Sequence, residues 1–358
     1  MHTRVVVYVS GAVIVALLAA VVAWRLLGAG STYETALGTL PKATLRTTFT
    51  DWAQVRADAH GTSLGAGSSR SKVEAFLSRA YDLDLTSGSA VAESTYAMQE
   101  KLGFSALDAQ WEAFGQGRAG QVDVMRVDDD VDLVGVERAL RRLGYTPPRT
   151  GSGEGGTWVG GPDLIASIDP DLTPVQQNVA VLPDDHLVLM SDSASYLSAA
   201  SSVAKGDEDA LSDDEGVSSL AKASGDPVAA VQWSSTFACE DLSMGSADDE
   251  DQRVSDDLVA KAGEVSPVDG VVMAQQADRS IVFGLHFETS DQASANLQTR
   301  VDLASGDAPG QGGSFADRFT LASGTAENQD VVLTTEPTRR DASVLSDLSS
   351  GPVLFATC

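Results

Sequence analysis

The clearest catalytic pattern in the chain is a serine in a G-x-S-x-G motif with histidines downstream. Ser63 occupies this motif at residues 61–65, and His186 and His286 follow it in the order that a hydrolase would need. The chemistry requires a strand before the serine and a helix after it, because a strained turn must present the hydroxyl to its histidine. Residues 52–60 are instead predicted to form a helix. We therefore interpret 61–69 as a flexible loop and keep a serine hydrolase only as the least favoured alternative.

An acidic run at residues 128–132 resembles the first half of a calcium loop. Such a loop needs glycine at its sixth position and a bidentate glutamate at its twelfth. Counted from Asp128, these positions hold Leu133 and Ala139. Acids here instead suit the first turn of a helix, where they offset its dipole and cap its free amides. We predict no metal site at this run.

Other polar clusters also lack the context that a cofactor site requires. The glycine-rich segment 151–156 has no lysine followed by serine or threonine, so it does not match a phosphate-binding loop. The acidic stretches at 207–209, 213–215 and 248–251 are predicted to be solvated loops. None of the histidines has a second histidine or cysteine at metal-ligand spacing. We predict neither a catalytic residue nor a cofactor.

The only two cysteines, Cys239 and Cys358, each end a short apolar run. In an exported domain an even and minimal number of cysteines permits one disulfide. A separation of 119 positions fits neither a metal site nor a redox C-x-x-C motif. We predict a bridge that fastens the carboxyl-terminal segment to the second half of the chain, with two unpaired thiols as the alternative.

Trp158 stands between glycines in the segment 155–161. Trp52, Trp111, Trp158 and Trp233 are most simply core or core-edge residues, although the glycines leave Trp158 unusually exposed for a packing residue. Exposed aromatic residues are often the anchors of a protein interface. Trp158 is therefore the candidate partner-contact residue.

An uncharged apolar run from Val5 to Trp24 is long enough to cross about 30 Å of hydrocarbon as a helix. Arg25 follows directly, which is typical of an interfacial aromatic residue with a neighbouring cation. A signal peptide usually has a shorter apolar region, although residues 28–30 could serve as its cleavage site. We expect a cytoplasmic tail at 1–4 and a single, uncleaved transmembrane anchor at 5–27.

The charge of the chain excludes one class of partner and helps to orient the anchor. Asp and Glu number 51 against 24 Lys and Arg, which gives a net charge of -27. Nucleic acid phosphates would be repelled by such a surface. An anionic cytoplasmic leaflet would also repel it, so we expect the body outside the membrane. The bias toward Ala, Asp, Gly and Val is typical of a high-GC bacterial genome, and the expected location is therefore the cell envelope.

The pattern of predicted elements divides the body into two α+β units. We expect a stalk at 28–43, a first unit at 44–205, an acidic linker at 206–227 and a second unit at 228–358. Each unit is predicted to run as strand, helical insertion, strand, helix, two strands and helix, which indicates a possible duplication. Both units are expected to contain mixed sheets with helices on one face. The helical insertion of the first unit includes a predicted helical face made by Leu107, Trp111 and Phe114.

These observations favour a membrane-anchored, non-catalytic binding or scaffold protein of the bacterial cell envelope. Its expected partner is an envelope protein or a lipid-linked component, since no catalytic motif survives inspection of its context. The main alternative is a carrier of an apolar or lipid-like ligand in a pocket between sheet and helices.

Overall fold

Local sequence signals set the ends of several helices in the computed structural model of the chain, which describes residues 30–149, 151, 155–339 and 341–358. Asp132 caps helix α6 (Leu133–Leu143) by accepting a hydrogen bond from the Gly135 amide at 2.8 Å. Gly144 ends the same helix with φ 101°, a conformation that glycine adopts without strain. The acidic run before α6 therefore caps a helix, as the sequence predicts.

The described elements run along the chain as groups of helices between single strands and hairpins. The strands are β1 (Arg46–Thr50), β2 (Ala109–Gly117), β3 (Gly120–Val127), β4 (Trp158–Val159), β5 (Asn178–Leu182), β6 (Leu187–Ser191), β7 (Ala229–Ser234), β8 (Gly270–Gln275), β9 (Ile281–His286), β10 (Phe319–Glu327) and β11 (Asp330–Pro337). The remaining α-helices are α2 (Thr32–Leu37), α3 (Trp52–Asp58), α4 (Arg70–Asp82), α5 (Thr95–Lys101), α7 (Pro162–Ile168), α8 (Ala194–Ala204), α9 (Glu215–Ser224), α10 (Phe237–Leu242), α11 (Asp249–Ala262), α12 (Ser290–Ala304) and α13 (Val344–Leu348). Short 3-10 helices are η1 (Pro174–Gln177), η2 (Leu211–Asp213), η3 (Met244–Ser246), η4 (Phe315–Asp317) and η5 (Leu354–Ala356).

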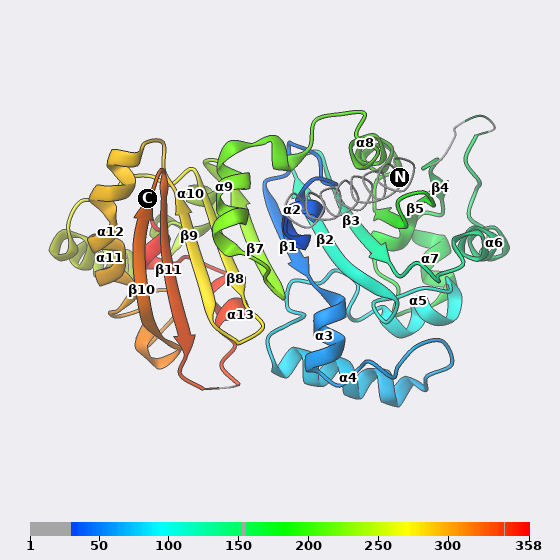
Figure 1. Cartoon of the computed structure of the whole chain (residues 1–358), viewed down its shortest axis with the longest axis horizontal. Coiled ribbons are helices and arrows are strands. Elements are labelled where there is room, and N and C mark those ends of the chain that lie inside the picture. Colours follow the sequence, from blue (N-terminus) through cyan, green and yellow to red (C-terminus); the bar gives the residue numbers. More distant parts are fainter. Residues whose placement is uncertain (1–29, 150, 152–154, 340) are drawn as a thin grey trace, which may run out of the picture. The chain divides into compact units, whose positions relative to one another are not determined.

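The eleven described strands form one sheet in the order β10-β11-β9-β8-β7-β1-β2-β3-β6-β5-β4 (Figure 1). Every pairing between them is antiparallel, so the prediction of mixed sheets is wrong. The reason lies in the hairpin that follows α6. Its second strand, β6, is the neighbour of β3, and it runs opposite to β3. The α+β class is nevertheless confirmed.

The two halves of the sheet share one strand order, although β2 and β8 are strands that the predicted repeat of elements did not contain. From the centre outward, the first half reads β1-β2-β3-β6-β5 and the second reads β7-β8-β9-β11-β10. The two opening strands, β1 and β7, pair antiparallel with Thr48 opposite Val231. A single sheet therefore passes from one half to the other without a break.

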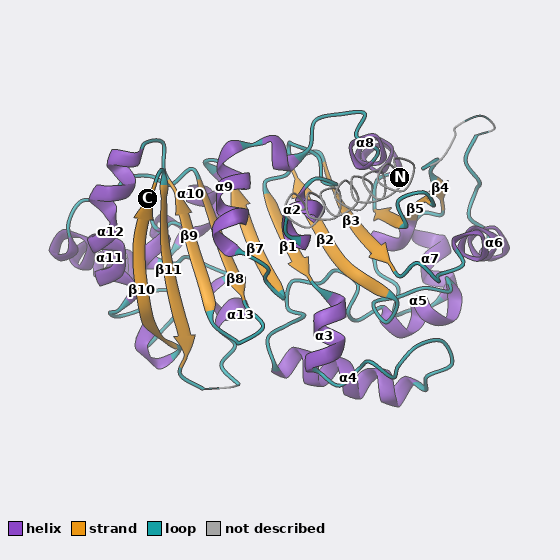
Figure 2. Ribbon diagram, viewed as in Figure 1, coloured by secondary structure: helices purple, strands orange, loops and turns teal. Residues whose placement is uncertain are grey.

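Helices cover both faces of this sheet and not one face only, which corrects a second expectation (Figure 2). One face carries two apolar cores: the first lies under α3 to α7 and the second under α10 to α13. The opposite face carries a third core under α2, α8 and α9. The third core spans β1, the strand at which the two halves meet, because Phe49 belongs to it.

The segments expected to be stalk and linker supply two of the helices on this opposite face. Tyr33 and Leu37 of α2 are buried, so residues 32–43 pack on the sheet and do not form a stalk. Val217 and Leu220 of α9 are also buried within the expected linker 206–227. Three of the acids that suggested a linker, at 213–215, lie at the start of α9, where Asp214 caps it.

The predicted helical face of Leu107, Trp111 and Phe114 is also wrong, because most of this segment is strand β2. Trp111 and Ala113 belong to the core under α2, whereas Glu112 between them is buried on the other face. A buried glutamate disguises the alternation that would identify a strand covered on both faces.

Within the described ranges, no helix combines the length and apolar character needed to cross a membrane. The predicted anchor at 5–27 and the tail at 1–4 lie outside the described residues.

Candidate functional site

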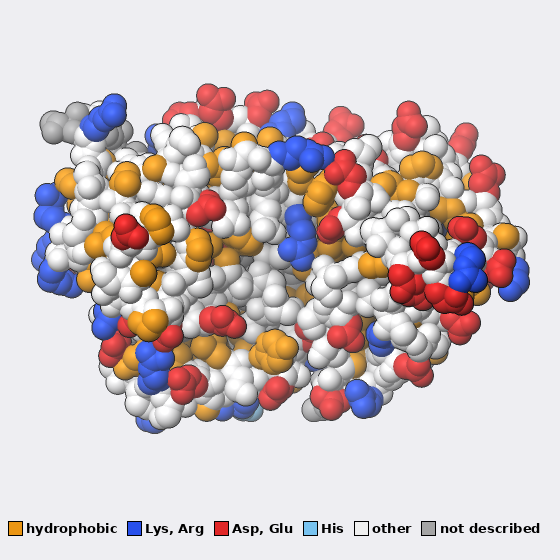
Figure 3. Space-filling view, turned by 180° about the vertical axis from the view of Figure 1, so that it is seen from behind, with side chains coloured by type: hydrophobic (Ala, Val, Ile, Leu, Met, Phe, Trp, Pro, Cys, Tyr) orange, Lys and Arg blue, Asp and Glu red, His pale blue; other side chains and the backbone are white. Residues whose placement is uncertain are grey.

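A polar cleft of about 610 Å³ lies between the two halves, on the face of the sheet that carries α3 and α10. Figure 3 shows this face, with basic side chains near its middle. The cleft is lined by segments from five parts of the chain: Leu45, Arg46, Ser87, Gln116, Gly117, Arg118, Phe237, Asp241, Ser346, Ser349, Ser350 and Gly351. Both halves are therefore needed to build it.

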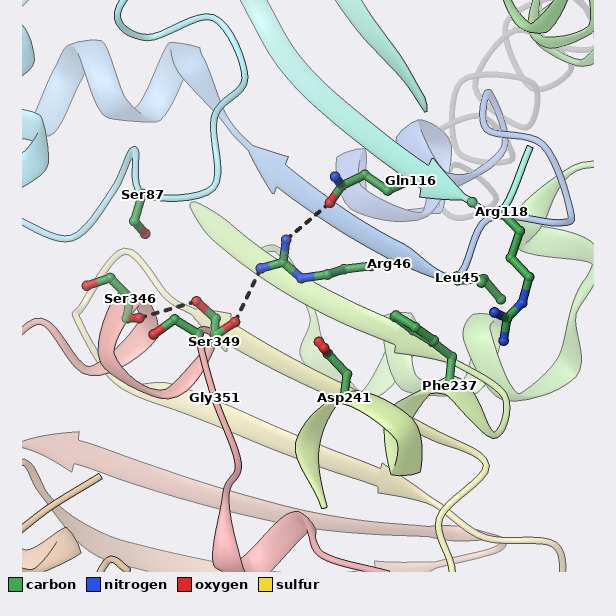
Figure 4. A pocket seen from close by; sticks show the side chains of 12 residues that line it. Leu45, Arg46, Ser87, Gln116, Arg118, Phe237, Asp241, Ser346, Ser349 and Gly351 are labelled. Carbon is green, nitrogen blue, oxygen red and sulfur yellow. Dashed lines mark hydrogen bonds between the residues drawn. The ribbon is translucent and has the colours of Figure 1, made fainter. Parts of the chain in front are cut away.

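Arg46, the first residue of β1, lies at the centre of the cleft (Figure 4). Its guanidinium donates to Gln116 Oε1 at 3.2 Å and to the Ser349 carbonyl at 3.3 Å. The guanidinium carbon also stands 5.5 Å from the centre of the Trp233 ring, within cation–π range. Burial lowers the pKa of Arg46, and the charge of Asp241 acts in the opposite direction. The contacts thus hold a partly desolvated cation in one orientation.

Helix α10 supplies the acidic and aromatic wall. Asp241 accepts a hydrogen bond from Trp233 Nε1 at 2.6 Å, so its carboxylate is fixed beside the cleft. Phe237 lies one turn earlier on the same helix. At the rim, Arg118 of the first half donates to both carboxylate oxygens of Glu240, at 3.1 and 2.9 Å. Strands and helix together place charges of both signs around one space.

The serine-rich wall follows α13 and is positioned from the other half of the molecule. Asp84 is buried in the first half, yet it accepts hydrogen bonds from the amides of Leu345 at 2.7 Å and Ser346 at 3.2 Å. It therefore caps α13 across the junction. Burial raises the pKa of Asp84, and the hydrogen bonds from Ser346 and Leu345 oppose this rise.

The lining can recognise a ligand that both donates and accepts hydrogen bonds. Arg46 and Gln116 supply donors, Asp241 supplies an acceptor, and serine hydroxyls can serve as either. Phe237 adds an apolar surface. The described lining contains no histidine, cysteine or lysine, so it holds no base beside a serine hydroxyl other than a carboxylate already bonded to an indole. The arrangement is suited to binding.

The structure does not assemble the predicted hydrolase residues into a triad. Ser63 is exposed in the loop between α3 and α4, and His186 lies in the β5–β6 turn. His286 of β9 is buried and its Nδ1 lies 2.6 Å from Asp330 Oδ1, while Ser219 Oγ donates to the other oxygen of that carboxylate. Serine and histidine thus share an aspartate, and neither activates the other. No described hydrogen bond connects Ser63 with either histidine.

The predicted disulfide between Cys239 and Cys358 is confirmed, with the two α-carbons 5.6 Å apart. It ties the end of the chain to α10, the helix that also carries Phe237 and Asp241. The buried guanidinium of Arg300 reinforces this attachment by donating to the carbonyls of Phe355 at 3.0 Å and Thr357 at 2.6 Å. One wall of the cleft is therefore covalently linked to the carboxyl-terminal segment.

Trp158 is only 3% exposed, which fits its interpretation as a core residue and does not favour its candidate role as a partner contact. It forms strand β4 with Val159 and stands opposite Val179 of β5. The Arg141 guanidinium covers its ring at 5.3 Å. The flanking glycines turn the chain around a buried strand and do not display the indole.

The described ranges contain no cluster of three or more His, Cys, Asp or Glu side chains arranged to hold a metal ion. The acidic run 128–132 instead contributes ion pairs with nearby arginines, of which Arg138 with Asp132 at 2.8 Å is one.

The cleft was missed by inspection of the sequence because none of its segments carries a motif. Its central residue occurs as a lone arginine at the start of a threonine-rich strand, and its acidic partner is 195 positions later. The sequence offered one signal, which was the charge of Arg46 at the start of the strand that opens the first half. That signal becomes meaningful only when the junction is known.

In the comparison with known proteins, no family model and no curated protein matches the chain. One solved structure, described as crystal form I of TP0453, aligns with 88% of this chain and 98% of its own length. The TM-score is 0.38 and the sequence identity is 9%. This likeness carries no argument about function.

Proposed function

We propose that this chain is a non-catalytic binding protein of the bacterial cell envelope, anchored in the membrane by residues 5–27 with its body outside. In this proposal the cleft around Arg46 holds a polar group of an envelope protein or of a lipid-linked component. The observation that carries the proposal is the cation itself, which is oriented by Gln116, Ser349 and Trp233 in a space open to a ligand.

The chemistry of the lining supports a ligand with several hydrogen-bonding groups. A partly desolvated guanidinium binds an anionic or carbonyl oxygen more strongly than an exposed one does, since water screens it less. Asp241 disfavours a purely anionic ligand, because its charge lies beside the same space. A polyhydroxylated or zwitterionic group satisfies both side chains.

Two further features are consistent with an envelope location. Disulfides such as Cys239–Cys358 persist in oxidising compartments outside the cytoplasm. The net charge of -27 would oppose an approach to the anionic inner leaflet. Both features support the orientation with the body outside.

The two alternatives are supported less well. An apolar carrier needs an apolar cavity of several hundred cubic ångströms, whereas the pocket between α11 and α12 measures about 230 Å³ and includes Lys261, Asp302 and Asp307. A serine hydrolase needs a hydroxyl hydrogen-bonded to a base, and Ser63 has no such bond to either candidate histidine among the described residues.

A site-specific crosslink in native membranes tests the proposal. A photoreactive amino acid at Ser350, in the cleft, is expected to give an adduct that the same group at Ser78 of α4 does not give. Both positions are exposed, so they are matched in access to solvent. Arg46→Met should reduce the Ser350 adduct at least tenfold while leaving the far-ultraviolet circular dichroism unchanged.

Arg46→Lys serves as the companion variant because it retains charge but loses the planar pair of donors. It should fall between wild type and Arg46→Met. Equal adducts from Ser350 and Ser78, or an adduct insensitive to Arg46→Met in a folded protein, would rule out the cleft as the binding site.

A further inference from the structure

The two edges of the sheet are finished in different ways, although the halves share a strand order. The first half ends in the two-residue strand β4, which pairs outside β5. The second half ends in β10, the counterpart of β5. Among the described residues, no strand pairs outside β10. The position that β4 fills in one half is thus open in the other.

In the first half, β4 closes both the backbone and the core at the edge. Trp158 and Val159 pair with Val179 and Asn178, and the indole is buried under Arg141. As a result, the strand behind it is buried along its whole length.

In the second half, β10 is nine residues long and largely open to solvent. Its exposed residues are small or uncharged apart from one glutamate: Thr320, Ala322, Ser323, Thr325 and Glu327. Edge strands are commonly protected by lysine, by proline or by a bulge that interrupts pairing. Only a bulge between Leu321 and Ser323 is present here, and Gly324 to Glu327 pair regularly with β11.

An apolar strip borders this open edge on the side of α12. It consists of Leu297 and Val301 of α12 with Leu321 and Ala326 of β10, all partly buried against the second core. Gly324 lies between the two strand residues, and a side chain added there would meet Val301 at 2.8 Å. In the first half, Trp158 is buried in the core on the same face of the sheet, under Arg141 of α6.

The backbone of β10 offers free pairing groups beside this strip. Residues 328 and 329 form a two-residue turn between Glu327 and Asp330, which places those two residues in a hydrogen-bonded pair. Along an antiparallel strand, the backbone N–H groups of successive residues point alternately toward and away from the paired strand. The N–H groups of Ala326 and Gly324 therefore face away from β11. They are the groups that an additional strand would bind.

We propose that the β10 edge binds an extended segment of a partner protein, which adds an antiparallel strand and lays an aromatic side chain over Leu297 and Val301. This docking site is separate from the Arg46 cleft and does not depend on it. The internal counterpart, β4, defines the chemistry of the occupant: a short segment with an aromatic residue next to a β-branched one. Addition of a strand to an open edge is an established mode of peptide recognition.

The probe is a fluorescein-labelled peptide with the sequence of residues 155–161, Gly-Gly-Thr-Trp-Val-Gly-Gly, added to the full-length chain in mild detergent. Fluorescence anisotropy is expected to show saturable binding. A peptide with alanine in place of the tryptophan should bind at least tenfold more weakly. Equal binding of both peptides, or none at millimolar protein, would overturn the proposal.

Ala326→Pro removes one outward N–H group and should weaken binding at least tenfold, whereas Ala326→Val retains that N–H and should bind like wild type. If Ala326→Pro does not fold, Leu297→Glu tests the site instead. It places a charge in the apolar strip and leaves the sequence of β10 unchanged. If either Ala326→Pro or Leu297→Glu folds and still binds the peptide as tightly as wild type does, the site is refuted. Reversible dimerisation that Ala326→Pro abolishes would assign the edge to a second copy of this chain and would equally refute a partner segment.

Discussion

The two halves of the sheet share one strand order but stabilise their cores with different chemistry. In the first half, the β2–β3 hairpin turns two carboxyl groups, Glu112 and Asp123, toward the helices. In the second half, the β8–β9 hairpin places Met273 and Phe283 on the same face. The second half is instead fastened by the Cys239–Cys358 disulfide. One topology therefore tolerates an acidic core and an apolar core that is covalently linked.

The carboxyl pair of the first half is fully buried, and its two members differ in their surroundings. Glu112 accepts hydrogen bonds from Trp52 Nε1 at 2.8 Å, Ser89 Oγ at 2.7 Å and the Ala90 amide at 2.6 Å. Among the described residues, no donor bonds to either carboxylate oxygen of Asp123. Burial and the neighbouring charge of Glu112 raise its pKa well above the ordinary value. We infer that Asp123 is the protonated member of the pair.

The second half depends on its carboxyl-terminal segment. Besides the disulfide, Arg300 donates to the carbonyls of Phe355, Thr357 and Ser266. Burial lowers the pKa of Arg300 to about 10, so this clamp stays charged at neutral pH. We therefore expect the stability of the first half to depend on pH and the stability of the second half to depend on reduction of the disulfide.

Removal of the disulfide should have the largest effect on stability. In the chain-entropy model, a closed loop of 119 residues stabilises the fold by about 4–5 kcal/mol. The double variant Cys239→Ser, Cys358→Ser should lower the free energy of unfolding in urea by up to that amount. Dithiothreitol should destabilise wild type to the same level and leave the variant unchanged. A variant as stable as oxidised wild type would show that Arg300 and packing suffice to hold the segment.

Replacement of Asp123 should change how stability depends on pH. The folded chain retains a proton on Asp123 that the unfolded chain releases above its ordinary pKa of 3.8. The free energy of unfolding of wild type should therefore fall as pH rises from about 4 toward the raised pKa. Asp123→Asn cannot ionise, so at pH 8 it should be more stable than wild type, and the difference between the two should be larger at pH 8 than at pH 4.

Urea unfolding at pH 4 and pH 8 measures this difference. Asp163→Asn, at an exposed position on α7, is the matched control and should follow wild type. If Asp123→Asn loses as much stability between the two pH values as wild type does, the proton is not held on Asp123.

Loss of the ion pair across the junction should have the smallest effect. Arg118 and Glu240 connect the two halves, but their side chains are 72% and 52% exposed. Exposed pairs contribute little because water and salt screen them. Arg118→Ala should change the free energy of unfolding by less than about 0.5 kcal/mol, as measured by thermal melting at two salt concentrations. A larger loss would show that the halves are held together by surface charge as well as by strand pairing.

The elements that were predicted well are those whose signals are local. The spacing of Val73, Phe76 and Ala80 predicts a helix at 71–81, and α4 covers Arg70–Asp82. Alternating apolar residues likewise predict a strand at 280–287, close to β9. Two segments with polar residues were predicted wrongly. Glu112 in β2 hides the alternation that identifies a strand, and the acids before α9 suggest a solvent-exposed linker.

The candidate site is less predictable than the fold, for a physical reason. Arg46 is oriented by residues 70, 187 and 303 positions away in the sequence, and only the sheet topology brings them together. The disulfide was predictable because only two cysteines exist, which leaves a single pairing. For Trp158 the sequence left both a core position and a partner contact open, because flanking glycines signal a turn but do not report on which side of the turn the indole packs.

The pairing of β1 with β7 also has a consequence for how the chain folds. β1 has only β2 and β7 as neighbours, so its first available partner begins about sixty residues later and its second more than 180 residues later. Contacts between such distant segments close slowly, because the loop entropy must be lost before the contact forms. Each hairpin can form early, whereas the centre of the sheet is completed only after β7 has emerged. β1, the first strand in the sequence, is therefore among the last strands to pair on both sides. Until then, its unpaired backbone groups can pair with a wrong strand.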